Sequence, residues 1–280
     1  MIRNHARPAL LAAFLAFTAL NALAQATYSP QVGQSGKDVI WVPTPSEVVE
    51  RMLTMAQVTP QDFVVDLGAG DGKIAIAAAR KFGARAMGIE YNADMAKHAN
   101  ANAKAAGVAG EGQGKALIKQ GDIFATDFSQ ATVVTMYLLP GLNLKLRPTI
   151  LSMRPGTRVV SHSFTMDDWE ADEISSIDGR QAYFWVVPAN VQGAWTLDAG
   201  GQKTTLTLDQ RYQKISGTIV LGPVSAGIRE PRLRGFNIAF AYVDEKGMRR
   251  EFAGTVSGGK MEGSFRDDKG NTGRWSATKK

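Results

Sequence analysis

The sequence of 280 residues contains no cysteine and only three histidines. The lack of cysteine excludes disulfide bonds, thiolate metal ligands and a cysteine nucleophile. Because the few histidines do not cluster, we expect no catalytic metal, and no serine-centred nucleophile motif is present. Hydrophobic residues make up 44% of the chain, which excludes an intrinsically disordered chain and suffices for one or two globular domains.

The first 24 residues have the pattern of an export signal. Arg3 and Arg7 precede an apolar run over residues 9–20. Ala22-Leu23-Ala24 supplies a small-x-small cleavage site, with Ala24-Gln25-Ala26 as an alternative. This run is shorter than the roughly 20 residues of a membrane-spanning helix. We therefore predict a signal peptide over residues 1–24 and an exported, periplasmic mature protein without a membrane span. An uncleaved leader that anchors the chain to the membrane is the alternative.

Positive charge is concentrated in the last third of the chain. Residues 25–188 carry 15 basic and 17 acidic side chains, whereas residues 189–280 carry 15 basic and 9 acidic ones. The local sequence pattern changes at the same point, so we predict a domain boundary near Pro188. The basic side chains of residues 189–280 fit either a patch that binds an anionic surface or a solvated face that protects sheet edges.

Residues 25–188 alternate between short apolar runs typical of buried strands and segments typical of helices. Strands are expected at 63–67, 86–90, 116–120, 131–139 and 157–164, helices at 47–55, 73–82, 93–106 and 142–153, and a closing antiparallel pair at 173–177 and 182–187. This alternation predicts an α/β fold with a doubly wound, mostly parallel sheet and helices on both faces.

Residues 189–280 contain short alternating segments that glycine-rich turns separate. Strands are expected at 204–208, 215–221, 236–243, 251–256, 261–265 and 273–277. Turns at intervals of roughly 8–12 residues are typical of small antiparallel folds. We therefore predict a small antiparallel all-β domain, barrel-like or sandwich-like, after the α/β domain.

The strongest chemical signal is Asp66-Leu67-Gly68-Ala69-Gly70-Asp71-Gly72, between a predicted strand and a predicted helix. Glycine lets the backbone turn tightly and approach a ligand that a Cβ atom would exclude. The dinucleotide fingerprint requires its third glycine one residue later, and it places a pyrophosphate at the helix N-terminus. The two carboxylates that flank this loop repel a pyrophosphate but suit a cationic ligand with an amino-acid tail.

This loop resembles that of the class I, seven-stranded S-adenosylmethionine-dependent methyltransferases. The resemblance implies S-adenosylmethionine as cofactor and a seven-stranded methyltransferase sheet. Glu90 ends the second strand, where it is placed to accept both ribose hydroxyls. Asp122 and Ile123 follow the third strand, where they are placed to bind the adenine. The predicted cofactor-binding residues are Asp66, Gly68, Gly70, Asp71, Gly72, Glu90, Asn92, Asp122 and Ile123.

A narrower resemblance rests on an ordered set of further segments. These are Trp41-Val42-Pro43-Thr44-Pro45, Glu90-Tyr91-Asn92, residues 131–146, and Arg158-Val159-Val160-Ser161-His162 with Trp169. The set looks like the archaeal broad-specificity protein-lysine methyltransferases, and it is similar to the mitochondrial enzyme that methylates a lysine of the ATP-synthase c-subunit. The resemblance covers roughly residues 38–187. The export signal and the basic all-β tail depart from the pattern of those families.

The resemblance implies methyl transfer to lysine side chains of a protein partner, with no nucleic acid. Tyr137, at the end of the fourth strand, is expected to hold the acceptor amine, and Leu138, Trp41 and Thr44 are expected to line the substrate site. A core role for the Tyr137 ring is the alternative. His162 is expected to be structural, and Asp167-Asp168 is expected to form a turn. Alternative functions are a small-molecule N- or O-methyltransferase and a cofactor-binding module without activity.

Overall fold

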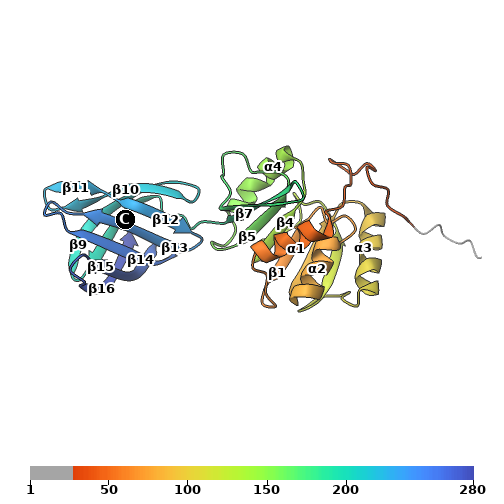
Figure 1. Cartoon of the computed structure of the whole chain (residues 1–280), viewed down its shortest axis with the longest axis horizontal. Helices are drawn as coiled ribbons and strands as arrows, with labels where there is room; N and C mark the ends of the chain where they lie inside the picture. Colours follow the sequence, from red (N-terminus) through yellow and green to blue (C-terminus); the bar gives the residue numbers. More distant parts are fainter. Residues whose placement is uncertain (1–27) are drawn as a thin grey trace, which may run out of the picture.

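The computed structural model describes residues 28–280, which form two sheets (Figure 1). The predicted signal peptide therefore lies outside the described residues. We call residues 28–187, which contain the helices and the first sheet, the α/β domain, and residues 188–280, which contain the second sheet, the β domain. Within residues 28–280, no helix is both long and apolar enough to cross a bilayer.

The first sheet has seven strands in the order β3-β2-β1-β4-β5-β7-β6. The strands are β1 (Phe63–Leu67), β2 (Arg85–Glu90), β3 (Ala116–Gln120), β4 (Val133–Met136), β5 (Arg158–His162), β6 (Glu173–Ile177) and β7 (Arg180–Val186). The strands from β3 to β5 are parallel, and β7 is antiparallel to both β5 and β6. This topology confirms the predicted doubly wound methyltransferase sheet.

Four helices cover the two faces of this sheet. They are α1 (Ser46–Met55), α2 (Lys73–Phe82), α3 (Ala93–Ala105) and α4 (Pro140–Leu151). Buried side chains of α1, α2 and α3 form one core on one face, and α4 contributes to a second core on the other face. Helix α4 begins two residues earlier than predicted, because Pro140 suits a first turn in which the backbone N–H has no helical partner.

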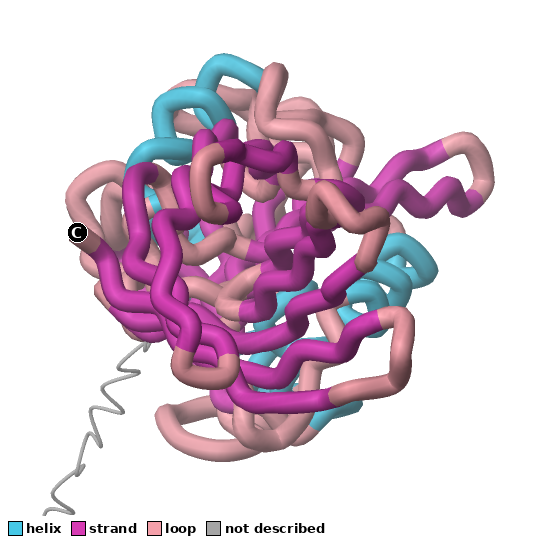
Figure 2. The backbone as a smooth tube through the Cα atoms, turned by 90° about the vertical axis from the view of Figure 1, so that its left-hand side faces the viewer, coloured by secondary structure: helices cyan, strands magenta, loops and turns pink. Residues whose placement is uncertain are grey.

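The β domain is one antiparallel sheet of nine strands in the order β11-β10-β9-β8-β16-β15-β14-β13-β12. The strands are β8 (Gly193–Ala199), β9 (Gln202–Arg211), β10 (Lys214–Leu221), β11 (Val224–Gly227), β12 (Arg229–Arg234), β13 (Asn237–Val243), β14 (Arg249–Ser257), β15 (Lys260–Asp267) and β16 (Thr272–Lys279). The sheet curls until its two ends approach each other, which makes the domain barrel-like (Figure 2).

Strands β8, β11 and β12 were not expected from the sequence. Strand β11 is short and mostly exposed, and β12 contains a proline and a register shift near Glu230, so neither has a regular alternating pattern. The aromatic residues Trp195, Tyr242 and Trp275 are buried in the core of the domain. They are therefore not available to the surface patch that was one interpretation of the basic tail.

A buried carboxylate joins the amino ends of three strands of the first sheet. Asp62 is 6% exposed and accepts hydrogen bonds from Thr59, Thr132 and Arg158, which lie in different segments of the chain. Burial raises the pKa of Asp62, but the hydrogen bonds from Thr132 and Thr59 and the charge of Arg158 outweigh it. The net effect holds the pKa of this carboxyl below its ordinary value.

Replacing Asp62 by Ala is expected to lower the free energy of unfolding by about 2–4 kcal/mol at neutral pH, because Arg158 and Thr132 then lose their partner. Because the folded-state pKa is lowered, the stabilisation is present above roughly pH 4 and is lost as the pH falls further. Urea unfolding followed by circular dichroism measures both effects. Glu245→Ala, at an exposed position, is the control. An equal loss of stability in both variants would contradict the role of Asp62.

Candidate active site

A cavity of about 310 Å³ lies at the carboxyl ends of β1, β2 and β4. Doubly wound sheets bind ligands at this edge. Residues 34–44, which we call the cover segment, form part of its wall, together with the glycine loop and the residues that follow β2, β3 and β4. The structure therefore brings together segments that are far apart in the sequence.

The backbone of the glycine loop lines the pocket at Gly68 and Gly70, where no side chain covers it. Gly68 and Gly70 have φ angles of +75° and +52°, in the left-handed region that favours glycine. A Cβ atom at Gly70 would lie 2.5 Å from Nε1 of Trp41, and one at Gly68 would lie 2.9 Å from Cδ2 of Leu138. Trp41 and Leu138 can therefore pack against the loop because positions 70 and 68 are glycine.

Gly72 does not line the pocket, unlike the other two glycines of the loop. It precedes α2 with a φ of +80°, and a Cβ atom there would lie 3.1 Å from Cβ of Ala99 and 3.2 Å from Cδ1 of Ile118. The structure therefore places Gly72, predicted to bind the cofactor, in the packing of α2 against α3 and β3.

Two backbone amides fix the carboxylate of Glu90 at the end of β2. Oε2 accepts a hydrogen bond from the backbone N of Gly70 at 2.9 Å, and Oε1 accepts one from the backbone N of Asn92 at 2.9 Å. Asn92 also lines the pocket and caps α3, since its Oδ1 accepts a hydrogen bond from the backbone N of Met95. Glu90 is thereby oriented before any ligand arrives.

Asp66 is a buried acid at the centre of the pocket wall. It is 2% exposed, and its Oδ1 accepts a hydrogen bond from Oγ1 of Thr135 at 2.8 Å. Burial raises the pKa of Asp66 to about 7, and the negative charges of Asp71 and Glu90 add to the rise. A cation bound beside these carboxylates would favour the ionised form of Asp66.

Asp122 follows β3 and lines the pocket, with Ile123 beside it in the pocket wall. Its Oδ2 is 2.6 Å from Nζ of Lys37, which also lies over the ring of Tyr91. The hydrogen bond from Lys37 is the main reason why the pKa of Asp122 is below its ordinary value. Lys37 ties the cover segment to Asp122, and sequence reasoning missed it because a single lysine in a polar loop carries no signal.

The part of the pocket wall that follows β4 and β5 is aromatic and apolar. Tyr137 lies directly after β4. Its ring is stacked on that of Phe164, with centroids 6.0 Å apart, and its centroid is 4.0 Å from that of the His162 ring. Oγ1 of Thr44 is 3.2 Å from Nδ1 of His162. Burial, with the charge of Arg180, lowers the pKa of His162 to about 4, so its ring is neutral at physiological pH.

Several residues of this wall were not expected from the sequence. Phe164 was assigned to the fifth strand, but β5 ends at His162 and Phe164 turns into the pocket wall. Lys73 also lines the pocket, and its Nζ donates a hydrogen bond to the backbone O of Thr44 at 3.1 Å. The structure brings together all the other predicted site residues, Trp41, Thr44, Tyr137 and Leu138 included.

The pocket fits a cationic ligand that also carries hydroxyl and amino groups. The carboxylates of Asp66, Asp71, Glu90 and Asp122 line it, with Lys37 and Lys73 as the basic groups in the wall. Its volume is within the range of small-molecule sites, which starts at about 300 Å³. Among residues 28–280, no group of three or more His, Asp or Glu side chains is arranged to hold a metal ion.

Comparison with known proteins places this site in a family. The family model of the ANTKMT methyltransferase domain matches residues 66–173. A protein-lysine N-methyltransferase from Saccharolobus islandicus is 44% identical over 155 residues, which are 53% of this chain and 94% of the relative. The human lysine N-methyltransferase of the ATP synthase c-subunit is 30% identical over 146 residues, and this chain spans 60% of its length.

A solved structure agrees with these matches. The crystal structure of a protein from Salinibacter ruber, described as an RNA methyltransferase in complex with S-adenosyl-L-homocysteine, is 49% identical. It superposes with a TM-score of 0.51 over 54% of this chain and 96% of its own. The relatives from Saccharolobus and Salinibacter are thus covered almost completely, and they leave about half of this chain unmatched.

The sheet order, the acid-flanked glycine loop and these matches define an S-adenosylmethionine-dependent methyltransferase. Within this class, the chain belongs to the family of the archaeal protein-lysine N-methyltransferase. The resemblance drawn from the sequence motifs is therefore confirmed. The individual roles assigned to the site residues stay predictions.

The affinity for S-adenosylmethionine is expected to fall as the pH drops below about 7, by up to roughly tenfold per pH unit. The reason is that Asp66 binds a proton in the free protein and must lose it to stabilise a bound cation. Isothermal titration calorimetry over a range of pH measures the affinity, and use of several buffers counts the released protons. In Asp66→Asn the affinity is expected to be lower and free of this pH dependence. An equal pH dependence in both proteins would contradict the assignment.

Proposed function

We propose that the chain transfers a methyl group from S-adenosylmethionine to the side-chain amine of lysine in a protein. The observation that carries the proposal is the contrast between the two ends of one pocket. Carboxylates line the end beside the glycine loop, whereas Tyr137, Leu138 and Phe164 form an apolar end. The 44% identity with a protein-lysine N-methyltransferase over nearly its whole length supports the same substrate class.

The acidic end would hold the cofactor. Glu90 suits the ribose hydroxyls, Asp122 and Ile123 suit the adenine, and Asp66 suits the ammonium group of the amino-acid tail. When bound, S-adenosylmethionine supplies a methyl group on a positively charged sulfur. Trp41, in the cover segment, lies against Gly70 and lines this part of the pocket.

The apolar end would bind and orient the acceptor. A lysine amine attacks only in its neutral form, and its ordinary pKa is about 10.4. Because an apolar environment disfavours the charged form, the rings of Tyr137 and Phe164 promote loss of the proton without a strong base. Alignment of the amine by these rings lowers the barrier by up to about 7–11 kcal/mol in favourable cases. The neutral ring of His162 packs against the ring of Tyr137.

Methylation of RNA is the second candidate, because the Salinibacter structure is described as an RNA methyltransferase. Proteins that bind nucleic acid neutralise phosphates with clustered Lys and Arg. Residues 25–188 of this chain carry more acidic than basic side chains, and Ile40, Val42 and Leu139 are exposed side chains around the pocket. These features favour a protein acceptor over RNA.

Replacing Tyr137 by Ala is expected to reduce methyl transfer to protein by about 10- to 100-fold, because the acceptor amine loses its aligned position. The affinity for S-adenosylmethionine should stay within about threefold, since the cofactor residues are untouched. Transfer of labelled methyl groups to an extract of proteins and to total RNA measures the first quantity, and calorimetry measures the second.

Tyr183→Phe, at a tyrosine outside the pocket, is the matched control and should retain full activity. Label in RNA alone would favour the second candidate, and label in small molecules alone would favour a small-molecule N- or O-methyltransferase. Cofactor binding with no transfer to any acceptor would indicate a binding module without activity.

We also propose that the protein is exported and that residues 1–24 are removed. The pattern of Arg3, Arg7 and the apolar run over residues 9–20 supports the proposal. Determination of the N-terminal sequence of the natively expressed protein is expected to give a start at residue 25. Retention of Met1 in a membrane fraction would indicate an anchored protein instead, and retention in the cytoplasm would contradict export.

A further inference from the structure

The segment between β5 and β6, residues 163–172, runs the height of the sheet. It starts after His162 at the pocket end, where Phe164 forms part of the pocket wall. It ends at Asp172, whose Oδ2 accepts a hydrogen bond from the backbone N of Val186, the partner of Arg158 at the opposite end of β5. We call these residues the β5–β6 segment. One continuous stretch of chain therefore contacts both ends of the α/β domain.

The β5–β6 segment is held in an unfavourable backbone conformation. Ser163 and Asp167, which flank Phe164 and Met166, have φ angles of +64° and +57° without being glycine. Such angles are uncommon for residues with a Cβ atom and persist only where the surroundings enforce them. From α4, Nδ2 of Asn143 donates a hydrogen bond to the backbone O of Thr165 at 3.1 Å.

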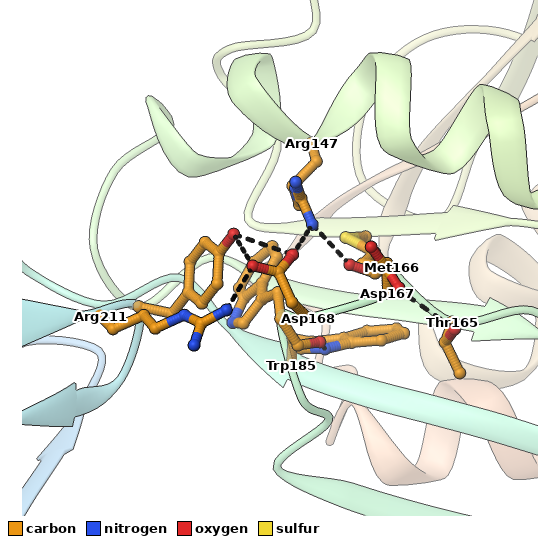
Figure 3. Close-up of polar contacts among 9 residues, drawn as sticks. Arg147, Thr165, Met166, Asp167, Asp168, Trp185 and Arg211 are labelled. Atoms are coloured by element: carbon orange, nitrogen blue, oxygen red, sulfur yellow. Dashed lines mark hydrogen bonds and ion pairs between the residues drawn. The ribbon is translucent and has the colours of Figure 1, made fainter.

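The β domain contributes to this support at Asp168. Figure 3 shows the carboxylate of Asp168 between Arg147 of α4 and Arg211 of the β domain. Arg211 lies 2.9 Å from Oδ2, and the hydroxyl of Tyr212 donates to the same oxygen at 3.1 Å. The hydrogen bond from Arg211, together with those from Arg147 and Tyr212, lowers the pKa of Asp168 to about 2. Asp168 is therefore ionised throughout the physiological pH range.

Aromatic packing strengthens the same connection. The ring of Tyr212 is stacked on that of Trp169, with centroids 6.0 Å apart and an interplanar angle of 25°. Trp169 is fully buried, and its backbone O accepts a hydrogen bond from Nε1 of Trp185 on β7. Tyr212 itself has a φ of +56°, so its backbone is also held in the left-handed region. The two domains thus meet at strained residues on both sides.

The β5–β6 segment contacts both the β domain, at Asp168 and Trp169, and the pocket, at Phe164. The β domain also touches Gly156, Phe184, Val186 and Arg147 of α4, none of which lines the pocket, and Arg147 in turn binds the backbone O of Met166 in the β5–β6 segment. The pocket-lining residues themselves all belong to the α/β domain. An influence of the β domain on the reaction is therefore expected to pass through the β5–β6 segment.

We infer that Arg211 and Tyr212 are positioning residues for methyl transfer, because they hold the β5–β6 segment that places Phe164 beside Tyr137. The inference rests on the proposed function, since it concerns the acceptor end of that site. It gives the β domain a role in the reaction. About half of this chain covers the Saccharolobus relative almost completely, so that relative has no part that matches the β domain.

Steady-state methyl transfer by the full chain tests the inference with Tyr212→Ala and Arg211→Ala. Each is expected to lower kcat/KM for the protein acceptor by roughly tenfold, because a small displacement of Phe164 misaligns the amine. The affinity for S-adenosylmethionine should be unchanged. Arg274→Ala is the matched control, since Arg274 is an exposed arginine of β16 in the same domain and lies outside the pocket wall. It should leave both quantities unchanged.

Two further variants separate positioning from a general loss of stability. Tyr212→Phe keeps the ring on Trp169 but removes the hydroxyl. Its kcat/KM for the protein acceptor should therefore lie between the values of the wild type and Tyr212→Ala. In Phe164→Ala, addition of Tyr212→Ala should cause little further loss, because both act through the same ring. Near-ultraviolet circular dichroism and thermal unfolding confirm that each variant is folded.

Wild-type kinetics in folded Tyr212→Ala and Arg211→Ala would overturn the inference, and so would fully additive losses with Phe164→Ala. A fall in cofactor affinity that parallels a fall in thermal stability would also overturn it, since that is the signature of a merely structural contact. Absence of transfer to protein by the unmodified chain would contradict the proposed function, and the inference with it. The two failures are therefore distinguished by the activity of the wild type.

Discussion

The pocket brings several carboxylates together around the glycine loop. Their mutual repulsion is the constraint on which this structure depends. The acids that line the pocket are Asp38, Asp66, Asp71, Glu90 and Asp122. Two of them raise the pKa of buried Asp66 further, so the part of the pocket around Asp66 favours binding of a positive charge. Only glycine at positions 68 and 70 lets Leu138 and Trp41 close on this loop. A cationic cofactor relieves the repulsion, which links binding to the geometry of the loop.

The division of one pocket into an acidic end and an apolar end explains how one site serves two opposite requirements. The cofactor has to be bound as a cation, whereas the acceptor amine has to be neutral. Carboxylates lie at or just after the carboxyl ends of β1, β2 and β3, while Tyr137 and Phe164 follow β4 and β5. Because each strand end contributes its own residues, the order of strands in the sheet separates the two environments.

The sequence predicted the first sheet and the cofactor end well, because both depend on local signals. Strands β1 and β3 and helix α2 have the predicted bounds, since buried apolar runs and an alanine-rich helix are strong patterns. Contacts between distant segments were beyond reach. Lys37 on Asp122 has no local signature. Asp167 and Asp168 form the predicted turn, but no local pattern indicated that Asp168 also joins α4 to the β domain. Gly72 packs near Ala99 and Ile118 and lies outside the pocket wall, and the glycine pattern alone does not tell ligand approach from helix packing.

The central claim is that the acid-flanked glycine loop holds S-adenosylmethionine with its sulfur directed at the aromatic end of the pocket. A crystal structure of the full chain with S-adenosyl-L-homocysteine tests it most directly. The account predicts the ribose at Glu90, the adenine at Asp122 and Ile123, and the sulfur facing Tyr137. An empty pocket at saturating ligand, or a sulfur that faces away from Tyr137, would contradict it.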